Sequence, residues 1–211
     1  MTPRRRIFVL HKNFTYSISR FTKSVHPIVT SPRNEKEFSH SLINLSSSWA
    51  NFLRAYVLSS IMGAKLGKNK ITTNAGFVND INTALGIAIK QIKPNATPRA
   101  DGSWNDFDEP NWLISNQIIK IATKLNFSNL TNISATFSTG SNSYDTLRIF
   151  RNYYAHRNRD LQRKVSNQCL IISMPSNLTV TEALASPTSN GTILFHKIID
   201  DLYIASKMLC H

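Results

Sequence analysis

Cysteines and long apolar runs are both scarce in this chain, and each scarcity excludes a class of protein. The 211 residues include two cysteines, Cys169 and Cys210, which lie far apart and form no Cys-x-x-Cys pair. We therefore expect neither a zinc site nor a disulfide framework, but free thiols in a reducing cytoplasm. No apolar stretch approaches the roughly 20 residues that span a bilayer, so no segment is expected to cross a membrane.

Acidic residues are also few, and this makes the chain strongly basic. Twelve Asp and Glu face 25 Lys and Arg, which gives a net charge of +13 and a pI near 10. A basic surface of this kind favours a polyanion as partner, with nucleic acid first among the candidates and an anionic membrane surface second. Apolar residues make up 41% of the chain, enough for one domain with a single core.

The first 34 residues differ in composition from the rest. They carry seven Lys or Arg and no acid. Phe14, Tyr16 and Ile18 alternate with polar residues, which is typical of a strand or an extended segment. We therefore expect residues 1–34 to form a basic N-terminal extended arm, closed by Pro27 and Pro32, and residues 35–211 to form the main domain.

Apolar residues beyond position 35 recur every three or four positions, which predicts helices. The fold class is therefore all-α, a helical bundle of about five helices. The intervening segments are expected to be loops, with a short strand within residues 126–142. The expected helices cover residues 35–64, 77–92, 111–125, 142–169 and 192–209.

The segment Arg148-Ile-Phe-Arg151-Asn152-Tyr153-Tyr154-Ala155-His156-Arg157-Asn158-Arg159 places one histidine among residues that bind phosphate. Imidazole can both accept and release a proton near neutral pH. Guanidinium stays charged and holds phosphate oxygens through a planar fork of donors. Together these groups are the minimum that metal-free cleavage of a phosphodiester needs, and they suit a simple phosphate-binding surface equally well.

On one continuous helix, most of the basic residues around His156 would share a face. The spacing of four, four, three and four aligns Arg148, Asn152, His156, Arg159 and Arg163. Arg151 would lie about 140° around the helix from His156, within reach of a long side chain. Spacing alone leaves two interpretations open, a solvated basic face and a phosphodiesterase site.

The run from Arg151 to His156 resembles the signature of HEPN domains (higher eukaryotes and prokaryotes nucleotide-binding). That signature is an arginine, often followed by asparagine, and then a histidine after four to six intervening residues. The resemblance implies a HEPN-like helical domain over residues 35–211. Many members of that family are metal-independent endoribonucleases that serve as toxins or antiviral effectors and dimerise to join two motifs.

The resemblance also implies roles for individual residues. Arg151, Asn152 and His156 would be catalytic, and no metal or cofactor would be needed. The RNA backbone would be bound by Arg148, Arg157, Arg159, Arg163 and Lys164. Cleavage would leave 2′,3′-cyclic phosphate and 5′-hydroxyl ends, in a homodimer with a composite active site at its interface and with an antitoxin or other regulatory partner.

Two alternatives to the enzyme stay open. One is a non-catalytic basic helical module that binds RNA or DNA within a larger assembly. The other is a scaffold whose charge complements an acidic partner. Two further segments are assigned structural roles. The segment Gly63-Ala-Lys65-Leu-Gly67-Lys68 is expected to be a helix end with solvated lysines. The acidic loop at 101–110 lacks the spacing of calcium ligands and is expected to stabilise the start of the helix after Pro110.

Overall fold

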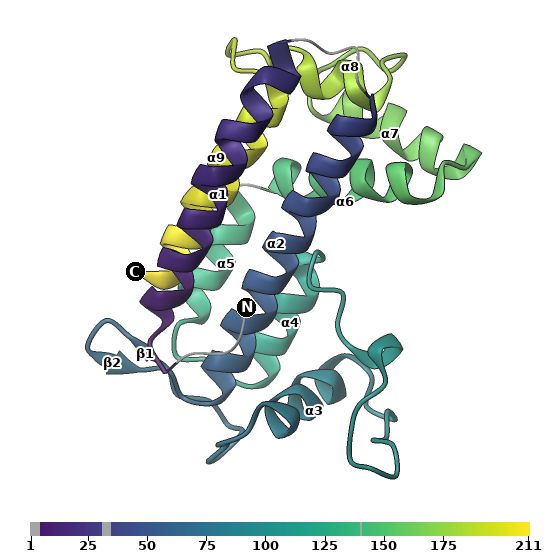
Figure 1. Cartoon of the computed structure of the whole chain (residues 1–211). Helices are drawn as coiled ribbons and strands as arrows, with labels where there is room; N and C mark the ends of the chain where they lie inside the picture. The colour runs from purple at the N-terminus through teal and green to yellow at the C-terminus, as the bar shows by residue number, and fades with distance from the viewer. Residues whose placement is uncertain (1–4, 31–34, 140) are drawn as a thin grey trace. The chain divides into compact units, whose positions relative to one another are not determined.

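The computed structural model describes residues 5–30, 35–139 and 141–211, and these residues are mostly helical (Figure 1). The predicted all-α class is confirmed, although the described residues form nine α-helices rather than about five. Their bounds are α1 Ile7–Thr30, α2 Glu35–Ile61, α3 Ile81–Ile92, α4 Ser115–Lys124, α5 Leu130–Thr139, α6 Ser141–His156, α7 Arg159–Ile171, α8 Val180–Ala185 and α9 Leu194–Cys210.

The chain divides into two compact units, which are described separately. The first unit comprises Met1–Phe14, Ala50–Thr139 and Ser206–His211. The second comprises Thr15–Trp49 and Gly140–Ala205. No helix in the described part of the chain is long and apolar enough to cross a membrane.

The extended conformation expected for the N-terminal arm is wrong, because Ile7–Thr30 form the helix α1. The buried apolar positions of α1 are separated by three, four or seven residues, as on one face of a helix: Ile7, Leu10, Phe14, Ile18, Val25 and Val29. Tyr16 is two-thirds exposed, so the alternation of Phe14, Tyr16 and Ile18 did not reflect burial. Pro32 lies outside the described residues, and the division of the chain at residue 34 stays a prediction.

The long helix α2 and the C-terminal helix α9 agree with the sequence predictions. Both have a continuous apolar stripe, and α3 is also present with a later start than expected. Asp80 caps α3 by accepting a hydrogen bond from the Thr83 backbone N–H at 2.7 Å. The helix therefore begins at Ile81, and the residues from Phe77 to Asp80 precede it.

Besides α1, three elements were not predicted from the sequence. The first, α5, lies in the Ser/Thr/Asn-rich segment that was expected to be a loop with a short strand. Its apolar residues are few, but Ile133 and Phe137 are buried one turn apart, with Thr136 between them. The Thr136 hydroxyl donates to the Asn132 carbonyl at 2.7 Å, so this buried polar group is satisfied within the helix.

The other two elements are a β-hairpin and α8. Strands β1 (Lys65–Leu66) and β2 (Asn69–Lys70) pair antiparallel where a helix end had been expected. The helix α8 begins with a capping box, in which Thr179 and Glu182 satisfy each other's backbone N–H groups. The 3-10 turn at Asp106–Asp108 lies in the acidic loop.

Each unit has its own aromatic core and one buried cysteine. In the first unit the Phe14 and Phe52 rings lie 4.9 Å apart, and Cys210 is buried. In the second unit Phe38 stacks against Phe195 at 6.0 Å, and Cys169 is buried. The cysteines are thus free thiols inside separate cores.

Candidate functional site

The histidine-containing segment does not form one helix to about Cys169, as the sequence predicted, but two. The first, α6, ends at His156, and α7 begins at Arg159. Arg157 has a φ of +41°, in the left-handed region that interrupts a right-handed helix. Asn158 then caps α7 by accepting from the Leu161 N–H at 2.9 Å. Arg157 and Asn158 are called the α6–α7 turn below.

The two helices fold back against each other within the second unit (Figure 1). The Gln168 amide on α7 donates to the Thr146 hydroxyl on α6 at 2.9 Å. These two residues are equally distant along the chain from Arg157, so the helices run antiparallel about that residue. Leu147 and Phe150 are fully buried on the inner side of α6.

The break divides the basic stripe expected from the sequence. Arg148, Asn152 and His156 do share one side of α6, because that helix is regular to its last residue. Arg159 and Arg163 belong to α7 and do not continue the same helical face. The continuous stripe is therefore wrong beyond His156, and the remaining basic residues are presented by the turn and the second helix.

His156 is the last residue of α6, and its side chain is exposed. Among the residues that the structure describes, none forms a hydrogen bond or an ion pair with its ring. Both ring nitrogens are therefore open to a ligand from solvent. An exposed imidazole at a helix end is accessible to a polymeric substrate, which a buried histidine would not be.

Arg151 turns its guanidinium toward the His156 side of α6. Its Nη1 donates to Asn152 Oδ1 at 3.2 Å, and Asn152 lies one helical turn before His156. Arg151 is half-buried, and its Nε is buried without a hydrogen-bond partner among the described residues. An unsatisfied buried donor on a cation costs free energy.

The expected RNA-binding residues differ in how much of their charge is already compensated. Three arginines pair with carboxylates: Arg148 with Asp145 at 2.8 Å, Arg157 with Glu35 at 3.1 Å and Arg163 with Asp160 at 3.5 Å. Arg159 and Lys164 are exposed and form no ion pair within the described ranges. Exposed pairs of this kind are weak in water, so a phosphate can compete with the carboxylates.

Tyr154 anchors the α6–α7 turn to the rest of the second unit. Its hydroxyl shares a 2.8 Å hydrogen bond with the Thr181 hydroxyl, and the Arg157 guanidinium lies 6.0 Å from its ring centre. Burial raises the pKa of Tyr154 to about 12, so it stays a neutral hydrogen-bonding group. Glu35 and Thr181 were not among the predicted site residues, because no sequence pattern links such distant positions.

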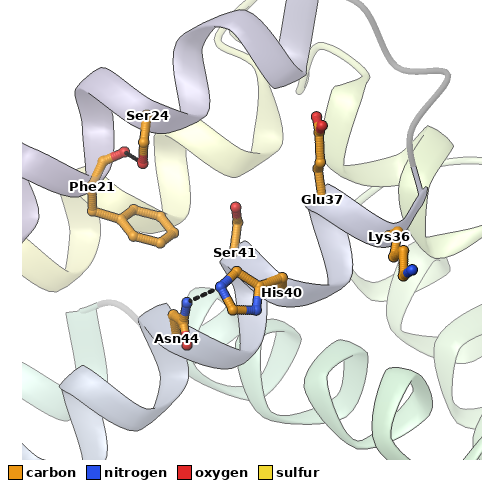
Figure 2. A pocket seen from close by; sticks show the side chains of 7 residues that line it. All are labelled: Phe21, Ser24, Lys36, Glu37, His40, Ser41 and Asn44. Carbon is orange, nitrogen blue, oxygen red and sulfur yellow. Dashed lines mark hydrogen bonds between the residues drawn. The ribbon is translucent and has the colours of Figure 1, made fainter.

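A separate hollow of about 660 Å³ lies between α1 and α2 in the second unit, as Figure 2 shows. Its wall includes Phe21 from α1 and His40 from α2. The Asn44 amide donates to His40 Nε2 at 2.9 Å, which leaves the ring less available than that of His156. Glu35, at the start of α2, is the residue that pairs with Arg157. The first turn of α2 therefore borders both the hollow and the α6–α7 turn.

The acidic loop is engaged by protein groups. Glu109 accepts two hydrogen bonds from Arg54 at 2.9 Å and one from Trp112 Nε1 at 3.0 Å. Asp108 pairs with Lys93 at 3.2 Å, and Asp101 accepts from Ser103. Across residues 5–30, 35–139 and 141–211, no three His, Cys, Asp or Glu side chains are grouped to hold a metal ion.

Comparisons of the chain with protein-family models, with curated proteins and with solved structures give no match.

Proposed function

We propose that this protein is a metal-independent endoribonuclease of the HEPN type, with its active site at the end of α6. The observation that carries the proposal is the turning of Arg151 toward Asn152, which brings a guanidinium to the side of the exposed His156. A proton-transfer group and a fixed cation at one edge of a basic protein are what phosphodiester cleavage requires. The resemblance of the Arg151–His156 run to the family signature supports the same activity.

In the proposed reaction, an RNA 2′-hydroxyl attacks the adjacent phosphorus. The O2′–P bond forms, the P–O5′ bond breaks, and the products are a 2′,3′-cyclic phosphate and a 5′-hydroxyl. One imidazole takes the proton from O2′, and an imidazolium gives a proton to the departing O5′. Arg151 stabilises the charge that develops on the phosphoryl oxygens, and Asn152 positions the guanidinium through the 3.2 Å hydrogen bond.

Each copy of the chain supplies one histidine to this reaction, whereas the proton transfers use a base and an acid. A two-fold homodimer that places two α6–α7 turns side by side would provide both. The second copy would contribute its own His156, and the active site would be a composite of two motifs at the interface.

The flanking cations would hold the RNA backbone. Arg159 and Lys164 offer uncompensated charge, and Arg148, Arg157 and Arg163 would exchange their carboxylate partners for phosphates. The 2′-hydroxyl requirement would restrict cleavage to RNA. We propose that the enzyme acts in the cytoplasm as a toxin or antiviral effector, restrained by an antitoxin or other regulatory partner.

A second candidate function is a non-catalytic module that binds RNA or DNA within a larger assembly. One observation favours it: among the described residues no partner orients the His156 imidazole, whereas a general base is commonly held by a second group. In this case the exposed cations of α7 would bind phosphates, and no bond would be broken.

Cleavage of total RNA by purified protein in excess EDTA tests the proposal. Wild type is expected to cut and to leave 2′,3′-cyclic phosphate ends, and His156→Ala is expected to lose about 10²-fold or more in rate. His40→Ala is the matched control, because it removes another exposed histidine from the second unit. This control should cut at the wild-type rate.

Two results would overturn the proposal of an enzyme whose active site contains His156. Equal cutting by wild type and His156→Ala would assign the activity to another group. If neither protein cuts RNA but both bind it, and Arg159→Gln with Lys164→Gln weakens that binding, the non-catalytic module becomes the function. Arg151→Lys refines the test, since it keeps the charge but loses the planar fork and should also reduce the cleavage rate.

A further inference from the structure

A second basic feature lies in the first unit, around the β1–β2 hairpin. It is a cleft of about 640 Å³, formed by the segment before α1, the end of α2, the hairpin and the segment before α3. It is called the hairpin cleft below. The lining residues used in the argument are Arg5, Arg6, Lys65, Lys70, Phe77 and Asn79.

Backbone hydrogen bonds bring these separate segments together. The Lys65 N–H donates to the Arg5 carbonyl at 2.7 Å, and Arg6 forms a parallel bridge with Lys65. Gly63 and Gly67 have φ values of +71° and +59°, which allow the chain to reverse after α2 and again within the hairpin. The cations of the N-terminal segment and of the hairpin are therefore held at one place by main-chain bonds.

The charges of the hairpin cleft are not compensated by carboxylates among the residues that the structure describes. Arg5, Arg6, Lys65 and Lys70 are exposed, and none forms an ion pair with another described residue. Lys65 and Lys70 lie directly opposite each other in the ladder, an arrangement that repels like charges. Lys68 adds a further exposed cation at the hairpin turn. A bound polyanion would relieve this repulsion.

The cleft also presents an aromatic ring to solvent. Phe77 is 93% exposed, although its apolar surface would be expected inside the protein. Asn79 in the same wall carries an amide that can pair with the edge of a base. Cations that follow a backbone, together with an aromatic face for stacking, are the features of single-stranded nucleic-acid sites.

We propose that the hairpin cleft binds single-stranded nucleic acid, as a site additional to the α6–α7 turn. Phosphates would contact Arg5, Lys65 and Lys70, and an unpaired base would stack on Phe77. Bases in a duplex are already stacked on their neighbours, so the ring selects single strands. An anionic membrane fits less well, because a lipid surface is bound by a broad apolar helix face rather than by a concave hollow.

The first test is fluorescence anisotropy with 2′-O-methyl oligouridine, a probe that cannot be cleaved by 2′-hydroxyl attack. Lys65→Gln with Lys70→Gln in the full chain should weaken binding about tenfold at low salt and reduce the slope of log affinity against log salt by about 1.4. The control Lys12→Gln with Lys120→Gln removes two exposed lysines of the first unit outside the cleft. It should change the affinity less than about twofold.

The second test addresses the aromatic ring. Phe77→Ala should weaken binding about tenfold. Phe107→Ala should leave it unchanged, since Phe107 is 85% exposed but does not line the cleft. An oligothymidine probe run in parallel should bind through the same residues, because the proposed site contacts the phosphates and the face of the base.

Three outcomes would overturn the proposal. Equal losses from the two lysine pairs would indicate non-specific attraction, and an unaffected Phe77→Ala would exclude stacking. Loss of binding to phosphatidylserine vesicles, rather than to either oligonucleotide, in Lys65→Gln with Lys70→Gln would assign the cleft to a membrane. None of these measurements depends on RNA cleavage, so they are independent of the outcome at His156.

Discussion

At the scale of single residues, Gly86 is a position where adding one carbon atom should disrupt the packing of α3 against Trp104. It lies in α3 with its α-carbon against the Trp104 indole, and a Cβ there would come 2.5 Å from Cζ2 of the ring. We expect Gly86→Ala to lower the free energy of unfolding by about 1–3 kcal/mol, measured by urea denaturation.

The sign of this effect makes the Gly86 test decisive. Alanine is intrinsically better than glycine within a helix by about 1 kcal/mol. A stabilised Gly86→Ala variant would therefore show that Trp104 does not pack on α3. A Trp104→Ala background should relieve the clash and reverse the sign of the substitution.

His11 should make stability depend on pH. The residue is buried on α1, its Nδ1 lies 3.0 Å from the Ser206 hydroxyl, and the His211 ring packs 5.2 Å away. Burial, followed by the nearby His211 and Lys207, lowers the pKa of His11 below its usual 6.5. The unfolded chain then binds the proton more readily, so the contribution of His11 is complete above about pH 6.5 and is lost as pH falls through the folded pKa.

Thermal unfolding between pH 5 and pH 8 measures this contribution. The Tm of the wild type should fall below about pH 6.5 more steeply than that of His11→Gln, which cannot take up the proton. His40→Gln, which replaces an exposed histidine, should follow the wild-type curve. Parallel curves for wild type and His11→Gln would contradict the assignment.

At the scale of elements, the break between α6 and α7 depends on the cap at Asn158. Replacing Asn158 by alanine removes the 2.9 Å hydrogen bond to the Leu161 N–H and should cost about 1 kcal/mol, or about 2–4 °C in Tm. Asn158→Ser keeps a capping oxygen and should retain most of the stability. An unchanged Tm in Asn158→Ala would show that the cap does not hold the turn.

Most helices could be predicted from the sequence, because burial follows a helical period in the long apolar stripes of α2 and α9. The α1 prediction failed because Tyr16 was included with Phe14 and Ile18 in an alternating apolar pattern, although apolar residues at helical spacing run from Ile7 to Val29. The prediction of one continuous helix over residues 142–169 failed for another reason. Arg157 adopts a positive φ that an arginine rarely takes, and the local composition does not indicate it.

The candidate site could be predicted in residue type but not in arrangement. The run from Arg151 to His156 predicted which residues would form the site, and this stays a prediction, whereas the alignment of Asn152 with His156 is seen in α6. The ion pair between Arg157 and Glu35 could not be predicted from the sequence, since it depends on a tertiary contact between distant segments. The hairpin cleft could not be predicted for the same reason, because it is formed by segments that are distant in the sequence.

At the scale of the whole molecule, the proposed composite active site makes activity depend on pairs of chains. Wild type and His156→Ala should be mixed in equal amounts, with time for subunits to exchange. If both histidines of a dimer are required, about a quarter of the all-wild-type activity should remain, because only wild-type pairs are competent. A monomeric enzyme would retain about half, and cleavage assays at several protein concentrations would distinguish the two.

The two buried thiols have a consequence for following motion in this protein. Burial raises the pKa of both Cys169 and Cys210, so neither is reactive while its surroundings stay closed. Cys210 belongs to the first unit and Cys169 to the second. The alkylation rates of the two thiols, distinguished by mass spectrometry of peptides, therefore report local opening of the two units separately. An RNA that stabilises only one unit would slow alkylation only of the cysteine in that unit.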